Sequence, residues 1–197
     1  MTNLGEPFTQ EEILRALDAE FTAVYDFFRS IAEDDFFAAP PEVWSPADNL
    51  VHLIKSCKPV GQGLNAPKLA LRMRFGMAEH ASRTLTEVRN QYVDVALAGG
   101  GKASGPYLPE VTEKTAVERE RILSKWQSVG EELTKGITKW SEKDLEKYQV
   151  QHPLLGNMTV REILFFTLYH NMHHVNDVQR LLSLPESEWF IAPAKAE

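Results

Sequence analysis

Apolar residues recur at helical spacing along several long stretches of this chain. The first stretch follows Thr9 and Glu12, which have the spacing of a capping box. Its apolar positions then repeat every three or four residues: Ile13, Leu14, Leu17, Phe21, Val24, Tyr25 and Phe28. The pattern fades at 33–37, and Pro40 with Pro41 ends any helix there. We therefore predict a first long helix from about residue 10.

A second apolar stretch follows Ser45, which suits a helix N-cap, and Pro46, which suits the first turn. The stripe on this helix consists of Leu50, Leu53, Ile54 and Cys57. Pro59, Gly61 and Gly63 come next, and these residue types disfavour a helix interior. The sequence therefore predicts that the second helix ends there.

The later part of the chain gives two further long helices. Residues 66–98 are predicted to be helical in two pieces with a break near Gly76, and 99–109 is the clearest loop. This loop either connects helices or forms the mouth of a pocket. A third long helix is predicted from about 113 to 140, and a short turn follows it.

The last long helix opens with a second capping box. Thr159 is the cap, Glu162 stands three places on, and the helix is predicted to run to about residue 184. No pattern typical of β-strands persists anywhere. Four apolar stripes are buried together in a four-helix bundle. We therefore predict an all-α fold: one four-helix bundle domain over 1–197, with a long, partly helical connection between the second and third main helices.

Composition narrows the classes of function. The chain has 197 residues and a net charge of −7, which argues against nucleic acid or an anionic membrane surface as a partner. No run of about 18 apolar residues suggests a membrane span. No secretion signal is recognisable, and the one cysteine, Cys57, excludes an internal disulfide. A cytoplasmic location is therefore expected.

The candidate chemistry lies in the last helix, where HNMHH at 170–174 holds three of the six histidines. His170 and His174 are spaced i and i+4, so they share a helix face and can bind one metal ion. His173 points about 100° away, toward a face with Tyr169 and Arg180 that should tolerate solvent or a subunit surface. Residue 171 is asparagine, so the HExxH protease motif is absent.

A third ligand must come from elsewhere in the chain. His52 is the best candidate because it lies inside an otherwise apolar helical stretch. The competitors are His80, in a polar segment, and His152, in the loop before the last helix.

Two segments together carry a family resemblance. WSPADNLVHLI, followed over a hundred residues later by HPLLGNMTVREILFFTLYHNMHH, resembles the DinB-like metal-binding four-helix bundles, and the likeness covers about 9–184. The loop GKASGPYLP fits one branch of that group. The resemblance implies that His52, His170 and His174 bind a divalent metal, for which we expect zinc or nickel.

Three protein ligands leave one metal position open, which is typical of a catalytic site. An open site can generate hydroxide, giving a hydrolase, or hold a thiolate, giving a thiol transferase. Some DinB-like proteins are similar to thiol S-transferases that use bacillithiol, mycothiol or related thiols. The resemblance therefore favours an enzyme that adds a low-molecular-weight thiol to a small electrophile. The alternatives are a metal-dependent hydrolase and a non-catalytic metal- or ligand-binding stress-response protein.

No catalytic acid or base can be assigned from the sequence. Asp48, one turn before His52, and Asp177, one turn after His174, are candidates for hydrogen bonds to ligand imidazoles. Asp48 also suits a helix N-terminus, and Asp177 also suits a solvated surface. The aromatic residues Trp189 and Phe190, together with the resemblance, lead us to expect a homodimer.

Overall fold

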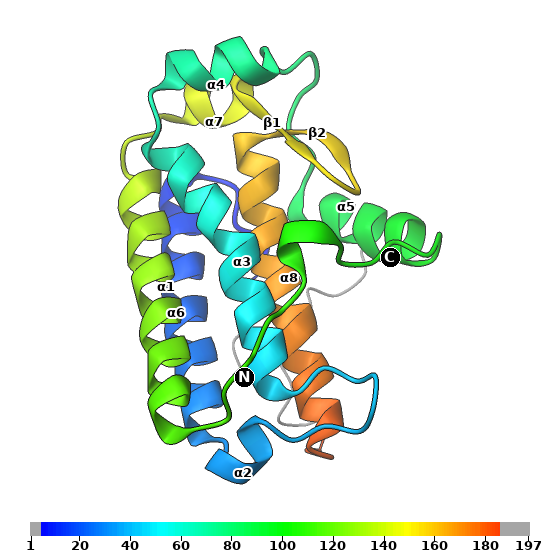
Figure 1. The fold of residues 1–197 in the computed structure, drawn as a ribbon. Coiled ribbons are helices and arrows are strands. Elements are labelled where there is room, and N and C mark those ends of the chain that lie inside the picture. The colour runs from blue at the N-terminus through cyan, green and yellow to red at the C-terminus, as the bar shows by residue number, and fades with distance from the viewer. Residues whose placement is uncertain (1–4, 186–197) are drawn as a thin grey trace.

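The computed structural model describes residues 5–185, so the aromatic pair expected at a dimer interface lies outside the described residues. Within that part of the chain, four long helices form a bundle (Figure 1): α1 (Gln10–Ser30), α3 (Pro46–Asn65), α6 (Ala116–Ile137) and α8 (Val160–Leu181). Both α1 and α3 contact α6 and α8, so the helices follow each other around the bundle as α1, α6, α3 and α8. The predicted four-helix bundle is confirmed.

Shorter elements cover the two ends and one side of this bundle. They are α2 (Glu33–Phe36), α4 (Lys68–Phe75), α5 (Leu85–Asn90) with a π-helical continuation (Gln91–Leu97), a 3-10 turn (Gly105–Tyr107) and α7 (Glu142–Lys147). In Figure 1, α2 lies at one end, and α4 and α7 lie at the other. The long, partly helical connection between α3 and α6 is confirmed. None of the helices within residues 5–185 is long and apolar enough to cross a bilayer.

Helix starts follow the sequence closely, because each depends on a local hydrogen-bond pattern. The predicted capping boxes at Thr9 and Thr159 are both present. The predicted break near Gly76 is also observed, where this residue has a φ of 77°. Helix α6 is shorter than predicted, since Thr115 caps its start.

Helix α3 runs to Asn65, so the prediction that it ends at 59–63 is wrong. Its last turns are held by contacts with distant residues. The Asn65 side chain donates to the Glu132 carbonyl at 3.0 Å, and the Trp140 indole donates to the Leu64 carbonyl at 2.9 Å. Gly61 lies close to Glu132 of α6. Tertiary contact therefore outweighs the local cost of Pro59 inside the helix.

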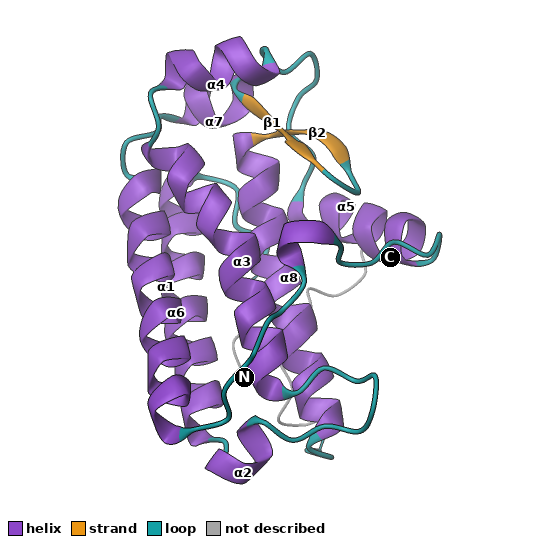
Figure 2. Ribbon diagram, viewed as in Figure 1, coloured by secondary structure: helices purple, strands orange, loops and turns teal. Residues whose placement is uncertain are grey.

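The expectation that no strand is present is also wrong. A two-stranded antiparallel hairpin, β1 (Gln149–His152) and β2 (Gly156–Thr159), precedes α8 (Figure 2). Each strand has four residues, which is too short for alternation to be recognised in the sequence. The turn is fixed by His152, whose Nδ1 accepts from the backbone N–H groups of Leu154 and Leu155, each at 3.2 Å.

Helix α8 is surrounded on more sides than its sequence suggested. Its residues from 160 to 172 are all buried, because α1 and α3 pack on one side and α5 packs on another. Phe166 and Tyr169 are each 7% exposed, and the Tyr92 ring lies edge-on to Phe166 at 5.1 Å. The face of α8 that was expected to tolerate solvent is therefore largely covered.

Candidate metal centre

The fold brings together three histidines from two helices that are distant in sequence. His52 comes from α3, and His170 and His174 come from successive turns of α8. One nitrogen from each ring lies within 4.8 Å of the others, and the Nε2 atoms of His52 and His170 are 3.2 Å apart. All three side chains are buried. The three ligands implied by the family resemblance are therefore adjacent, and the competing His80 and His152 are outside this cluster.

Hydrogen bonds to the far side of two rings set their tautomers. His52 Nδ1 lies 2.7 Å from the backbone carbonyl of Tyr107, and His174 Nδ1 lies 2.9 Å from the side-chain oxygen of Asn49. Both partners are oxygen acceptors, so each Nδ1 carries the proton. Each Nε2 therefore has a free lone pair, which is the form that binds a metal.

The orientation of Asn49 is itself fixed by the backbone. Its amide nitrogen donates to the Ser45 carbonyl at 3.0 Å and to the Trp44 carbonyl at 3.3 Å. The side-chain oxygen must then face His174. Asn49 is thus an orienting residue that the sequence analysis missed, although its position three residues before His52 puts both on one face of α3.

The donor set fits a divalent metal ion. Two nitrogens bound to one tetrahedral ion with bonds near 2.1 Å lie about 3.4 Å apart. The 3.2 Å separation of the His52 and His170 nitrogens is close to this value. Burial, reinforced by the neighbouring imidazoles, lowers the pKa of His170 and His174 well below the ordinary 6.5, and burial also lowers the pKa of His52. The rings are therefore neutral, as metal binding requires.

Aromatic rings pack against all three histidines. The Trp44 ring stacks on His174 with centroids 5.9 Å apart and also lies 4.9 Å from the His52 ring. Phe166 stacks on His170 at 4.9 Å. These contacts restrict the rotamers and exclude water from the rings, so the ligand geometry is preorganised.

His173 lines the cavity that adjoins the three histidines but is outside the three-histidine cluster. His173 is half-buried, and its Nε2 lies 3.5 Å from Asp177. Asp177 pairs with Arg180 at 2.8 Å, whereas its nearest oxygen is 3.9 Å from His174 Nδ1. The hydrogen bond to His174 that we expected from Asp177 is thus supplied by Asn49.

Asn171, which stands where an HExxH motif has glutamate, faces the bundle core. Its amide donates to the Glu20 carboxyl at 3.2 Å, and its oxygen accepts from the Cys57 thiol at 3.4 Å. All three residues are buried. Burial is also the main cause that raises the pKa of Cys57, so this thiol is inert, in line with the small buried side chain expected from the sequence.

The other sequence candidates have structural partners. Asp48 is part of the capping box of α3, where it accepts from the Ser45 hydroxyl at 2.6 Å. His80 lies 3.3 Å from Glu162 at the start of α8. His152 fixes the hairpin turn, and burial lowers its pKa to about 4. It is therefore a neutral ring in the wall of the adjoining cavity.

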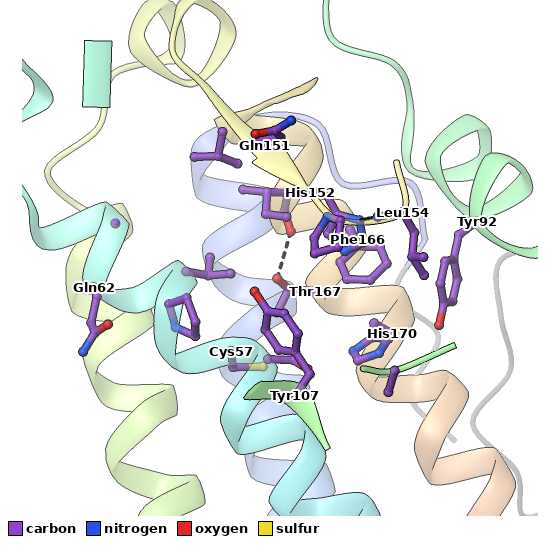
Figure 3. Close-up of a pocket in the computed structure, with 18 of the residues that line it drawn as sticks. Cys57, Gln62, Tyr92, Tyr107, Gln151, His152, Leu154, Phe166, Thr167 and His170 are labelled. Atoms are coloured by element: carbon purple, nitrogen blue, oxygen red, sulfur yellow. Dashed lines mark hydrogen bonds between the residues drawn. The ribbon is translucent and has the colours of Figure 1, made fainter. Parts of the chain in front are cut away.

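A cavity of about 820 Å³ adjoins the three histidines. It runs along α8 between α3, α4, the hairpin and the segment that crosses from α5 to α6. Figure 3 shows His170 toward one end of it and Gln151 of β1 toward the other, with Gln62 and Tyr92 on opposite sides. A cavity of this size with mainly apolar walls can hold a small organic ligand. A ligand in this cavity would therefore lie beside the three histidines.

The contacts of Asn49 lead to a first prediction. Asn49→Ala should weaken metal binding roughly 10–100-fold, because His174 loses the acceptor that fixes its tautomer. Competition with a chromophoric chelator at neutral pH measures the change. Asp177→Asn is the matched control and should stay within about twofold of the wild-type affinity. A larger effect from Asp177→Asn than from Asn49→Ala would contradict this account.

The chain matches a known protein family. A family model described as the DinB superfamily matches residues 16–178. None of the curated proteins that were searched matches the chain. The matched range includes all three clustered histidines.

Proposed function

The chain belongs to the DinB superfamily, and from that premise we propose that it is a divalent-metal-dependent thiol S-transferase. The observation that carries the proposal is the position of His52, His170 and His174 at the wall of an 820 Å³ cavity. The family and the three-histidine cluster are compatible with metal binding, and the cavity supports a substrate beside the metal. Zinc and nickel are the metals that we propose.

The protein supplies three neutral nitrogen ligands and leaves room for another donor on the cavity side. A zinc or nickel ion held there would stabilise the thiolate form of a bound thiol, which is the nucleophile. In the overall reaction the thiol loses its proton to solvent, a carbon–sulfur bond forms, and the leaving group departs from the electrophile with its bonding electrons.

The chain's own residues do the positioning. Trp44 and Phe166 hold the ligand rings, and Asn49 together with the Tyr107 carbonyl keeps each Nδ1 protonated. Among the described residues that line the cavity none is aspartate or glutamate, and burial lowers the pKa of His152 to about 4 and also lowers the pKa of His173. Asp48 accepts from the Ser45 hydroxyl, and Asp177 pairs with Arg180. Addition of a thiol requires no protein base once the thiolate has formed, so this arrangement suits thiol transfer better than hydrolysis.

Activity of the metal-loaded protein tests the proposal. We expect metal-dependent consumption of a reactive aryl halide or epoxide with at least one low-molecular-weight thiol, at least tenfold above the rate of metal-stripped protein. His80→Ala is the matched control, because His80 does not line the cavity, and it should keep activity, whereas His170→Ala should lose it. Binding of metal and thiol without turnover would favour the non-catalytic alternative. Turnover of an ester without any thiol would favour the hydrolase.

A further inference from the structure

The hydroxyl of Tyr92 is a buried polar group without a partner in the part of the chain that the structure describes. The side chain is only 5% exposed, yet no hydrogen bond joins its hydroxyl to any of residues 5–185. By contrast, the buried indoles of Trp126 and Trp140 each donate to a backbone carbonyl, at 3.0 and 2.9 Å. Buried tyrosine hydroxyls usually have such a partner, so this O–H group is available to a bound molecule.

Tyr92 lines the 820 Å³ cavity beside the three histidines. Its ring centre lies 6.0 Å from that of His170 and 5.9 Å from that of His173, and it meets both rings edge to face. Figure 3 shows the hydroxyl end of the Tyr92 side chain turned toward His170. The O–H group therefore lies in the cavity next to one of the three candidate ligands, where the sulfur of the proposed substrate would also lie.

The backbone that carries Tyr92 has an unusual form. Residues Gln91–Leu97 are π-helical and continue α5. Each π-helical turn spans one more residue than an α-helical turn, and such turns occur frequently at functional sites. The Phe166 ring lies edge-on to Tyr92 at 5.1 Å, and the Tyr169 ring lies 6.2 Å away. These contacts restrict the Tyr92 ring, so its hydroxyl is held in a fixed direction.

The chemistry of the hydroxyl suits an anionic acceptor. A phenol keeps its proton at neutral pH because its ordinary pKa is near 10, and burial raises the pKa of Tyr92 to about 12. None of the described residues that line the cavity is aspartate or glutamate, so no carboxylate of the cavity wall competes for the proton. A hydrogen bond to a charged acceptor, such as a thiolate, is stronger than one to a neutral acceptor.

We propose that Tyr92 is a substrate-binding residue whose phenol donates a hydrogen bond to the thiolate sulfur of the substrate beside His170. This inference rests on the proposed function, because it takes the sulfur to lie at the three histidines. It adds a polar group from the connection between α3 and α6 that selects the deprotonated form of the thiol. The hydrogen bond stabilises the thiolate relative to the neutral thiol and fixes the direction of one sulfur lone pair.

Thiol binding to the cobalt-substituted protein tests the inference. The probe is 2-mercaptoethanol, and the thiolate-to-cobalt absorption band reports sulfur bound at the metal. Tyr92→Phe removes the hydroxyl and keeps the ring, so we expect the thiol to bind about tenfold more weakly through loss of a hydrogen bond to a charged group. The band should also move to longer wavelength, because the hydrogen bond lowers the energy of the sulfur electrons that are excited.

Two controls separate this hydrogen bond from a general change in the site. Tyr169→Phe removes the hydroxyl of a neighbouring buried ring that does not line the cavity, so it should leave the thiol affinity and the band unchanged. Imidazole binds a metal through its acceptor nitrogen and then has no acceptor left. It should therefore bind the wild-type and Tyr92→Phe cobalt proteins with affinities within about twofold of each other.

The failures are distinguishable. Unchanged thiol affinity and band position in Tyr92→Phe would overturn this inference and leave the thiol transferase intact. Equal losses of thiol and imidazole affinity, or a weaker affinity with an unshifted band, would also overturn the hydrogen bond to sulfur. Cobalt binding by the wild-type protein without a thiolate band for any thiol would overturn both proposals.

Discussion

Replacing His170 or His174 with alanine should remove most of the bound metal at neutral pH, whereas His173→Ala should keep it. The first two rings converge with His52, and their nitrogens lie within 4.8 Å of one another. In structural metal sites a binding free energy of about 10–16 kcal/mol is shared among four ligands. Loss of one of three ligands should therefore weaken binding by roughly 10²–10³-fold. Elemental analysis after dialysis against a weak chelator measures the metal content.

The alanine variants of His170, His173 and His174 also test which face of α8 points toward the metal. His173 is the matched control because it belongs to the same HNMHH stretch but points toward Asp177. His52→Ala should behave like His170→Ala, since it removes the ligand contributed by α3. Loss of metal from His173→Ala with retention in His174→Ala would mean that the i, i+3 pair binds the ion. Unchanged content in all four variants would refute the metal centre.

Glu162→Gln should destabilise the fold by about 3–5 kcal/mol, the range found when one partner of a buried ion pair is removed. The Glu162 side chain is fully buried and accepts from the Arg83 guanidinium at 2.7 and 3.0 Å, from the Arg83 backbone N–H at 2.8 Å and from the Thr159 backbone N–H at 2.9 Å. A glutamine at this position would place its side-chain NH2 group opposite some of these N–H donors, and the NH2 group cannot accept their hydrogen bonds. Urea unfolding at pH 7 measures the loss. Glu87→Gln, which alters the exposed capping box of α5, should cost at most about 1 kcal/mol.

The cost of Glu162→Gln should depend on pH. Burial by itself raises the pKa of Glu162, but the hydrogen bonds from Arg83 and Thr159 outweigh it and leave the pKa below the ordinary 4.5. The folded protein therefore binds this proton less readily than the unfolded chain. The stabilisation is complete above about pH 4.5 and is lost as the pH falls through the lower, folded pKa. A wild-type-to-variant difference that stays constant down to pH 3 would contradict this origin.

Local signals explain which parts of the fold were predictable. The capping boxes at Thr9 and Thr159 need only four consecutive residues, and the long apolar repeats fix the helices that follow them. The end of α3 depends instead on Glu132 and Trp140, which are about 70 residues away in sequence. The hairpin has four residues per strand and was invisible for a different reason, since so short a segment carries almost no periodic signal.

The candidate site also combines residues that the sequence predicts with residues that only the fold reveals. Helical phase alone singled out His170 and His174. The apolar surroundings of His52 favoured it over His80 and His152 as the third partner, and the family resemblance then supported this choice. Asn49 and Asp48 both lie on the His52 side of α3, and the sequence analysis favoured the carboxylate. The structure engages Asp48 in the helix cap, and this leaves Asn49 to contact His174. The Tyr107 contact uses a backbone carbonyl, which no side-chain pattern can reveal.

That carbonyl has a consequence for how ligands enter and leave. Tyr107 belongs to the segment that borders the cavity, and its oxygen holds the proton-bearing nitrogen of His52. A displacement of this segment that moved the Tyr107 carbonyl away from His52 would remove the group that fixes the His52 tautomer. Metal affinity and access to the cavity are then thermodynamically linked: a bound metal favours the closed segment, and an open segment weakens the metal by the same factor. Hydrogen exchange of 104–110 should therefore slow when metal binds, at a distance in sequence from every proposed ligand.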